Sequence, residues 1–114
     1  MDQYRDGLNG IFQALGDPTR RAVLGRLGAG PASVSELARP FDMALPSFMK
    51  HIRLLEGSGL IRTAKQGRVR TCEIDRTQLA AAEDWLANQR AIWEGRADRL
   101  AQYVAALQEK EKSK

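Results

Sequence analysis

The stretch Pro46–Leu60, PSFMKHIRLLEGSGL, has the pattern of a short helix that ends at a glycine. Phe48, Ile52 and Leu55 recur at helical spacing, so one side of this helix can pack inward. The remaining positions include polar and basic residues, namely Ser47, Lys50, His51 and Arg53. A short helix with a donor-rich face is the kind of element that a DNA major groove admits. An ordinary amphipathic helix with a solvated basic face is an equal alternative until the flanking sequence is considered.

The ends of this helix are marked by proline and glycine. Pro46 suits the first turn, where its missing N–H costs nothing. Gly57 and Gly59 are expected to provide positive φ angles for the exit, after which Leu60 leads into a strand.

The composition predicts one ordered, soluble domain. The 114 residues are 43% hydrophobic and 28% charged, a balance typical of a single globular domain. No apolar run is long enough to span a bilayer or to act as a signal peptide. The single cysteine, Cys72, excludes an internal disulfide and fits a cytoplasmic location.

The positive charge is concentrated in the middle of the chain. The net charge is +4, yet residues 20–70 hold ten lysines and arginines and only three acids, Glu36, Asp42 and Glu56. That segment therefore carries +7 and the rest of the chain −3. Such a local excess favours a polyanion as partner. A membrane surface is less favoured, because no basic helix also has the broad apolar face that interfacial binding needs.

Two helices are predicted ahead of the basic helix. Residues 1–16 form the first, which Gly16 ends. Asp17 is expected to cap the second, which starts at Pro18 and ends near Leu27. The apolar stripe of the first helix consists of Tyr4, Leu8, Ile11, Phe12 and Leu15. Arg20 and Arg21 are candidate phosphate contacts, with ordinary surface arginines as the alternative.

Residues 35–57 have the layout of a helix-turn-helix. Ser35 is expected to cap a short helix that Pro40 ends, and Val34 to pair briefly as a strand before it. A short connection then leads into the basic helix. Two short helices joined by a tight turn, the second of them basic, are typical of a DNA-reading element.

Residues 61–74 are predicted to form a β-hairpin. Two short strands, Ile61–Ala64 and Val69–Ile74, flank a turn at Lys65–Arg68. The basic residues of the hairpin are Lys65 and Arg68 in the turn and Arg70 on its flank. A basic hairpin directly after a helix-turn-helix is a wing, which lays cations against phosphates beside the groove. The alternative is a hairpin whose charges only keep an edge strand soluble.

Residues 78–109 are predicted to form one long helix. Apolar residues recur every seven positions from Leu79 to Leu107, which favours pairing with another helix. At about 1.5 Å per residue the helix is roughly 45 Å long, more than one small domain can cover. We therefore expect residues 1–16 and 78–109 to form a homodimer interface, with a helix folded on its own core as the alternative. The candidate interface residues are Tyr4, Leu8, Ile11, Phe12, Trp85, Trp93, Leu100, Tyr103 and Leu107.

Four segments carry a family resemblance that covers nearly the whole chain. They are residues 12–21 (FQALGDPTRR), 34–38 (VSELA), 41–61 (FDMALPSFMKHIRLLEGSGLI) and 66–70 (QGRVR). Together they closely resemble the ArsR/SmtB-type winged-helix transcriptional repressors. The end of the chain, with Trp85 and Trp93, looks like the branch that lacks the metal sites. The resemblance implies a single winged helix-turn-helix domain over residues 1–114, mainly α, with about five helices and a two-stranded wing.

The resemblance also implies a homodimer that represses transcription by occupying operator DNA. In the family, the helix matching Pro46–Glu56 enters the major groove, and the hairpin matching Arg62–Glu73 touches the minor groove or the backbone. The candidate DNA-binding residues are Ser47, Lys50, His51, Arg53, Lys65, Arg68, Arg70, Arg20 and Arg21.

Two positions depart from the family pattern. Ala44 stands where a capping serine or threonine is usual, so the basic helix loses that side-chain cap. Asp42 is the nearby residue expected to substitute for it. Met49 stands where a serine often contacts DNA, so the operator is expected to differ from those of relatives.

No group of residues predicts catalysis, a cofactor or a metal site. Residues 33–35 are Ser-Val-Ser where metal sensors of the family have cysteines, and the last helix has no histidine. Four acids of that helix are expected to form a solvated face: Glu83, Asp84, Glu94 and Asp98. Cys72 is expected to be a small half-buried hydrophobe rather than a redox group. His51 is expected to contact DNA, with a packing histidine as the alternative.

The sequence therefore predicts a DNA-binding transcriptional regulator, most simply a dimeric repressor of a pseudo-palindromic operator. Double-stranded DNA and a second copy are its expected partners, and no membrane is. One alternative is a winged helix used for protein–protein assembly through the tryptophan stripe. Another is a repressor gated by an unidentified small-molecule inducer in an apolar pocket at the dimer seam.

Overall fold

A computed structural model describes residues 3–112, and the side chains from residue 7 onward. Within this range the chain forms five helices and three strands. In order they are α1 (Gln3–Leu15), α2 (Pro18–Leu27), β1 (Ala32–Ser33), α3 (Val34–Ala38), α4 (Leu45–Gly57), β2 (Ile61–Gln66), β3 (Val69–Ile74) and α5 (Arg76–Lys112). The expected mainly helical winged architecture is confirmed, with a short third strand beside the two strands of the wing. The chain divides after Ala82 into two compact units.

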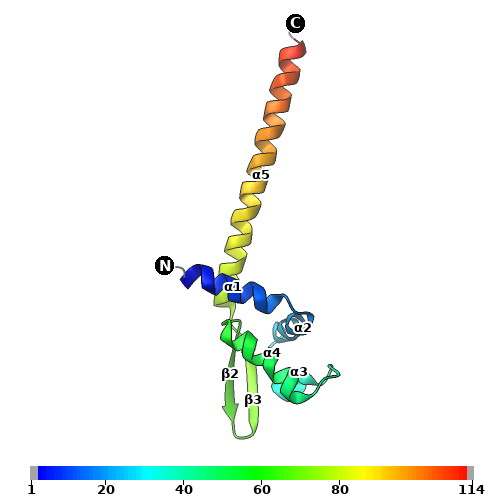
Figure 1. Ribbon diagram of the computed structural model, residues 1–114, viewed down its shortest axis with the longest axis vertical. Helices are drawn as coiled ribbons and strands as arrows, with labels where there is room; N and C mark the ends of the chain where they lie inside the picture. Colours follow the sequence, from blue (N-terminus) through cyan, green and yellow to red (C-terminus); the bar gives the residue numbers. More distant parts are fainter. Residues whose placement is uncertain (1–2, 113–114) are drawn as a thin grey trace. The chain divides into compact units, whose positions relative to one another are not determined.

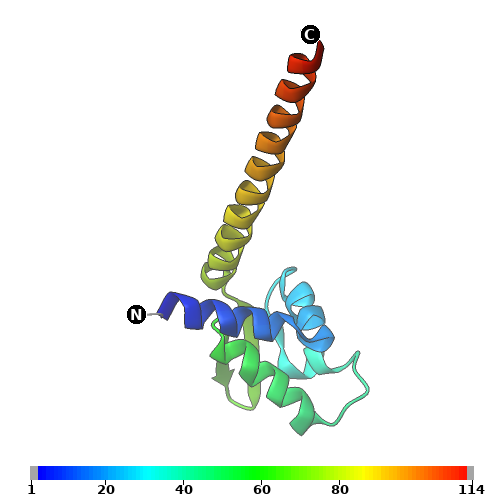
Figure 2. The same cartoon turned by 45° about the horizontal axis from the view of Figure 1, so that its top comes forward.

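The first unit packs its helices against one another and against a small sheet. In the two views of Figures 1 and 2, α1 runs beside α4, and α4 contacts β2 of the β2–β3 hairpin. Phe48, Ile52 and Leu55 are completely enclosed, as their helical spacing predicted. Burying each of these side chains contributes roughly 1.5–3 kcal/mol. The core therefore fixes the inner face of α4 and leaves its outer face to solvent.

The start of α3 differs from the sequence prediction. Its N-cap is Ser33, not Ser35: the Ser33 hydroxyl accepts from the Glu36 N–H at 3.1 Å. In return the Glu36 carboxylate accepts from the Ser33 N–H at 3.2 Å. This reciprocal capping box satisfies two backbone donors. The strand expected at Val34 lies one residue earlier, as β1, and Val34 is the first residue of α3.

The sheet is antiparallel in the order β1-β3-β2, so β3 is central. The turn of the hairpin is shorter than predicted. Gln66 pairs with Val69, which leaves only Gly67 and Arg68 in the loop, and Gly67 has a φ of 63°. Such a two-residue turn matches the twist of the strands. Lys65 therefore belongs to β2 and lies opposite Arg70 on β3.

The helix α4 is slightly longer than predicted at both ends. It begins at Leu45, with Ala44 in an extended N-cap conformation and no side-chain hydrogen bond, so Asp42 does not supply the missing cap. At the other end Gly57 is still helical and Ser58 is the C-cap. The positive φ of the exit falls on Gly59 alone of the two expected glycines, at 82°.

The helix α5 is uninterrupted from Arg76 to Lys112, beyond the predicted residues 78–109. Within α5, which is described throughout, Ala82 is the one buried residue. The second unit is thus a helix whose large apolar side chains are exposed: Trp85, Leu86, Ile92, Trp93, Leu100, Tyr103, Val104 and Leu107. Among residues 3–112, no helix combines the length and the apolar composition needed to cross a membrane.

Two candidate interface residues of α1 belong to the core instead. Leu8 is 8% exposed and Ile11 is 1% exposed, because both pack within their own chain. Little of either side chain is exposed, so their place in an interface with a second copy stays a prediction that their burial does not favour. Phe12 remains on the surface of α1. The side chain of Tyr4 lies outside the described residues.

Candidate nucleic-acid interface

The outer face of α4 presents three of the predicted DNA-binding residues. Ser47, Lys50 and Arg53 are all exposed, because they occupy the positions between the buried residues of the same helix. Long basic side chains on the free face of a short helix can reach phosphates and base edges. The local pattern of the sequence therefore placed these three residues correctly on the surface.

The predicted wing residues meet the beginning of α4 in one groove. This groove, of about 410 Å³, is lined from the hairpin by Lys65, Arg68 and Arg70, and from α4 by Leu45 and Met49. None of the described residues that line it is acidic. Three cations and the start of the candidate reading helix thus face the same space. A sugar–phosphate backbone entering this groove would meet positive charge only.

The register of the hairpin brings two of these positive charges close together. Lys65 lies directly opposite Arg70, and like charges opposite each other on a sheet repel. Arg70 is held in place: one of its Nη atoms donates to the Thr63 hydroxyl at 2.8 Å, and that hydroxyl donates to Glu56 of α4 at 2.6 Å. A bound phosphate would relieve the repulsion between the two cations.

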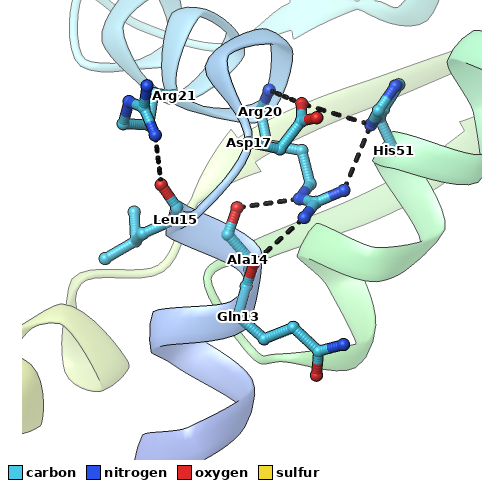
Figure 3. A network of polar contacts seen from close by, with 7 residues as sticks. All are labelled: Gln13, Ala14, Leu15, Asp17, Arg20, Arg21 and His51. Carbon is cyan, nitrogen blue, oxygen red and sulfur yellow. Dashed lines mark hydrogen bonds and ion pairs between the residues drawn. The ribbon is translucent and has the colours of Figure 1, made fainter.

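Arg20 and Arg21 contact the end of α1 (Figure 3). The Arg20 Nε donates to the Ala14 carbonyl at 2.7 Å, and its Nη2 donates to the Gln13 carbonyl at 3.0 Å. Arg21 donates to the Leu15 carbonyl at 2.7 Å. Basic groups stabilise a helix C-terminus by bonding its last carbonyls. Both arginines therefore have a structural task that their position in the sequence did not reveal.

His51 is directed at the start of α2 rather than standing free on α4. Its Nδ1 lies 3.2 Å from Arg20 Nη1 and 3.5 Å from the Asp17 carboxylate (Figure 3). With no proton on Nδ1 the imidazole accepts there from Arg20, whereas with a proton on Nδ1 it donates to Asp17. The structure thus gives the packing alternative for His51 specific partners, of which Arg20 lies 31 residues away in sequence.

Asp17 is the predicted N-cap of α2. Its carboxylate accepts from the Arg20 N–H at 3.0 Å. That backbone hydrogen bond is the main cause that lowers the pKa of Asp17, and the neighbouring His51 and Arg20 side chains act in the same direction. The carboxylate stays ionised at neutral pH and holds α2, Arg20 and His51 together.

The remaining reactive groups lie apart from this surface. Burial raises the pKa of the Cys72 thiol, with the nearby Glu56 acting in the same direction, so the group stays protonated and enclosed. In the described part of the chain, no three His, Cys, Asp or Glu side chains gather closely enough to hold a metal ion.

Arg53 is separated from the wing residues. It lines a different cavity, of about 190 Å³, together with Arg20 and Leu54. This cavity lies where α4 passes α1. The candidate residues therefore form a wing-side group on the hairpin and a group beside α1, and Lys50 is exposed on α4.

Comparison with known proteins identifies the family. Residues 15–64 match a helix-turn-helix domain family. A crystal structure of an ArsR family transcriptional regulator is 71% identical, with a TM-score of 0.78, and covers 82% of this chain and 97% of that one. The chain belongs to the ArsR family. Members of this family are DNA-binding transcriptional regulators, and the expected family and function class are confirmed.

Two characterised relatives extend this picture of an ArsR-family regulator. The HTH-type transcriptional regulator Rv2034 of Mycobacterium tuberculosis is 40% identical over 81 residues, which are 71% of this chain and 75% of that protein. The transcriptional repressor SdpR of Bacillus subtilis is 28% identical over 81 residues, 71% of this chain and 90% of that protein. A homodimeric winged helix-turn-helix domain from Mycobacterium bovis shares the fold at 19% identity and a TM-score of 0.59, over 76% of this chain and 82% of that one.

Proposed function

We propose that this ArsR-family regulator is a homodimeric repressor that binds a pseudo-palindromic operator in the cytoplasm. In each copy, α4 lies in the major groove and the β2–β3 wing contacts the neighbouring backbone. Residues 35–57 are the reading element, residues 61–74 the wing, and α5 with the exposed part of α1 the dimer interface. Two copies related by a two-fold axis match a site with two half-sites.

The groove shared by α4 and the wing is the observation that carries this proposal. Lys65, Arg68 and Arg70 face the start of α4 across it, without an acid among the described lining residues. Protein–protein assembly would not need three cations gathered in one groove. Repression, rather than activation, is supported by the name of the Bacillus subtilis relative. A copy bound over a promoter would exclude polymerase without any further contact.

Salt dependence of DNA binding tests the proposal directly. The probe is a duplex selected by the protein from a random-sequence pool, and binding is measured by fluorescence anisotropy at several salt concentrations. Arg68→Ala should weaken binding to all duplexes similarly and flatten the plot of log affinity against log salt by about one per copy of the lost contact.

Arg76→Ala is the matched control. Arg76 is exposed at the start of α5, just after the last residue of β3. At the usual rise of a strand, that end of β3 lies about 20 Å from the hairpin turn. Its loss should leave the slope unchanged. Failure to select any specific duplex, or an unchanged slope for Arg68→Ala, would overturn the assignment of the wing to the DNA backbone.

A further inference from the structure

The start of α4 exposes apolar surface where DNA-binding side chains are expected to be polar. Leu45 is 56% exposed in the first turn. Met49 follows one turn later on the same flank and is partly exposed. A single exposed leucine needs no explanation. This pair needs one, because both side chains line the groove whose hairpin wall carries three cations together with the exposed Val69.

The groove has one kind of occupant that suits both walls. The cations favour phosphates, so a nucleic-acid strand is the partner whose charge matches. Leucine and methionine cannot pair the donors and acceptors of base edges, and covering such groups without a partner costs free energy. Among major-groove edges, the C5-methyl group of thymine is the apolar one.

We propose that Leu45 and Met49 read thymine methyl groups in each operator half-site. The inference rests on the proposed function and adds the chemistry that the operator must have. Residues at the N-terminal end of a recognition helix are those that reach base edges, and Leu45 is the first residue of α4. Specificity at these base pairs then comes from apolar contact, while Lys50 and the wing supply attraction that is blind to sequence.

A change confined to the DNA provides the first test. In the duplex selected by the wild-type protein, each thymine is replaced in turn by deoxyuridine, which removes only the methyl group. We expect about a fourfold loss of affinity at one or two thymines per half-site, because the burial of one methyl group is lost. The slope against salt should not change at these positions, because no phosphate contact is lost.

Protein variants then assign the methyl contacts. With Leu45→Ala or Met49→Ala, the deoxyuridine penalty at the corresponding thymine should disappear, because the contact is already absent. Leu54→Ala is the matched control: it removes the same side chain from the same helix, at 50% exposure, but from the cavity beside α1. The penalty should persist in that variant.

Each outcome separates this inference from the proposed function. A specific duplex whose affinity is unaffected by every deoxyuridine overturns the methyl readout and leaves the repressor proposal standing. A penalty that persists in Leu45→Ala and Met49→Ala assigns the methyl contact elsewhere and also overturns it. A change of oligomeric state in Leu45→Ala, with a flat deoxyuridine profile, would make this flank a contact between copies. Failure to obtain any specific duplex overturns both proposals.

Discussion

At the scale of single residues, the polar contacts around Arg20 decide which cations are available to DNA. Arg20 bonds two carbonyls of α1 and approaches His51 of α4. A guanidinium has five donors in a fixed fork, and the structure uses three of its nitrogens within the chain. Arg20 therefore has a structural role, whereas Lys50 on α4 is exposed.

Arg20→Ala is expected to change stability but not the salt dependence of DNA binding, and Lys50→Ala the reverse. Arg20→Ala should lower the free energy of unfolding by roughly 1–3 kcal/mol, because charged hydrogen bonds to the end of α1 are lost. It should leave the salt slope of DNA binding unchanged. Lys50→Ala should change stability by less than about 0.5 kcal/mol and flatten the slope by about one. Denaturant titration and anisotropy measure the two quantities, and a flattened slope with unchanged stability for Arg20→Ala would place Arg20 on DNA.

Asp17 should make the stability of the protein depend on pH in the acid range. Its pKa in the folded state lies below the ordinary value of 3.8. Its contribution to stability is therefore complete above that value and is lost as the pH falls through the lowered one. Asp17→Asn keeps a good capping side chain but removes the charge. The wild type should be about 0.5 kcal/mol more stable at pH 7, and the difference should shrink as the pH falls below 3.8.

Urea unfolding at a series of pH values checks this prediction, with Asp84→Asn as control. Asp84 is an exposed acid of α5, so its replacement removes the same charge without touching a helix cap. A stability difference between wild type and Asp17→Asn that stays constant down to pH 3 would contradict the role of the ionised cap.

The residues of this network show what the sequence could and could not predict. Asp17 was predictable because a cap bonds only three residues ahead. The contacts of Arg20 with α1 and with His51 depend on the packing of three helices, which no local pattern encodes. For the same reason the sequence placed His51 with the DNA-binding residues, although its Nδ1 faces Asp17.

At the scale of helices and strands, boundaries were lost where two neighbouring residues offered the same signal. Ser33 and Ser35 are both able to cap α3, and only Ser33 has a glutamate three residues later to complete the capping box. The hairpin turn was overestimated because Lys65 and Gln66 are polar, which is equally compatible with an exposed strand. Core positions of α4 were predicted correctly, since burial sets their spacing directly.

The uncapped start of α4 should be open to improvement. Ala44 has the extended conformation of an N-cap, with φ −65° and ψ 147°, and no side-chain hydrogen bond. Ala44→Ser should therefore raise the free energy of unfolding by about 1 kcal/mol, because its hydroxyl can accept from a free N–H of the first turn. Thermal unfolding measures the gain, and Ala22→Ser in the exposed middle of α2, which should slightly destabilise, is the control.

At the scale of the whole molecule, the main feature of α5 is its exposed apolar face. Leu86, Trp93, Leu100 and Leu107 recur every seven residues and are all exposed. A strict repeat of this kind favours a left-handed pairing of two helices. The sequence predicted this surface well, because a seven-residue repeat is visible without any tertiary contact. It did not show that Leu8 and Ile11 pack in the core of their own chain, since an apolar stripe does not reveal whether it faces its own core or a second copy.

Disrupting this face should separate the two copies and weaken operator binding. Trp93 is 67% exposed in the described chain, so Trp93→Glu should not disturb the core of its own copy. It should shift the protein from dimer to monomer in sedimentation velocity, because a charge cannot be buried cheaply between two helices. Gln102→Glu adds the same charge on the opposite side of α5 and should leave the dimer intact.

Two linked copies bind two half-sites with an effective concentration advantage of about 10²- to 10⁴-fold. Trp93→Glu should lose most of that advantage on a full operator and very little on a single half-site. Equal losses on both duplexes, or a variant that remains dimeric, would show that α5 does not join the copies through this face.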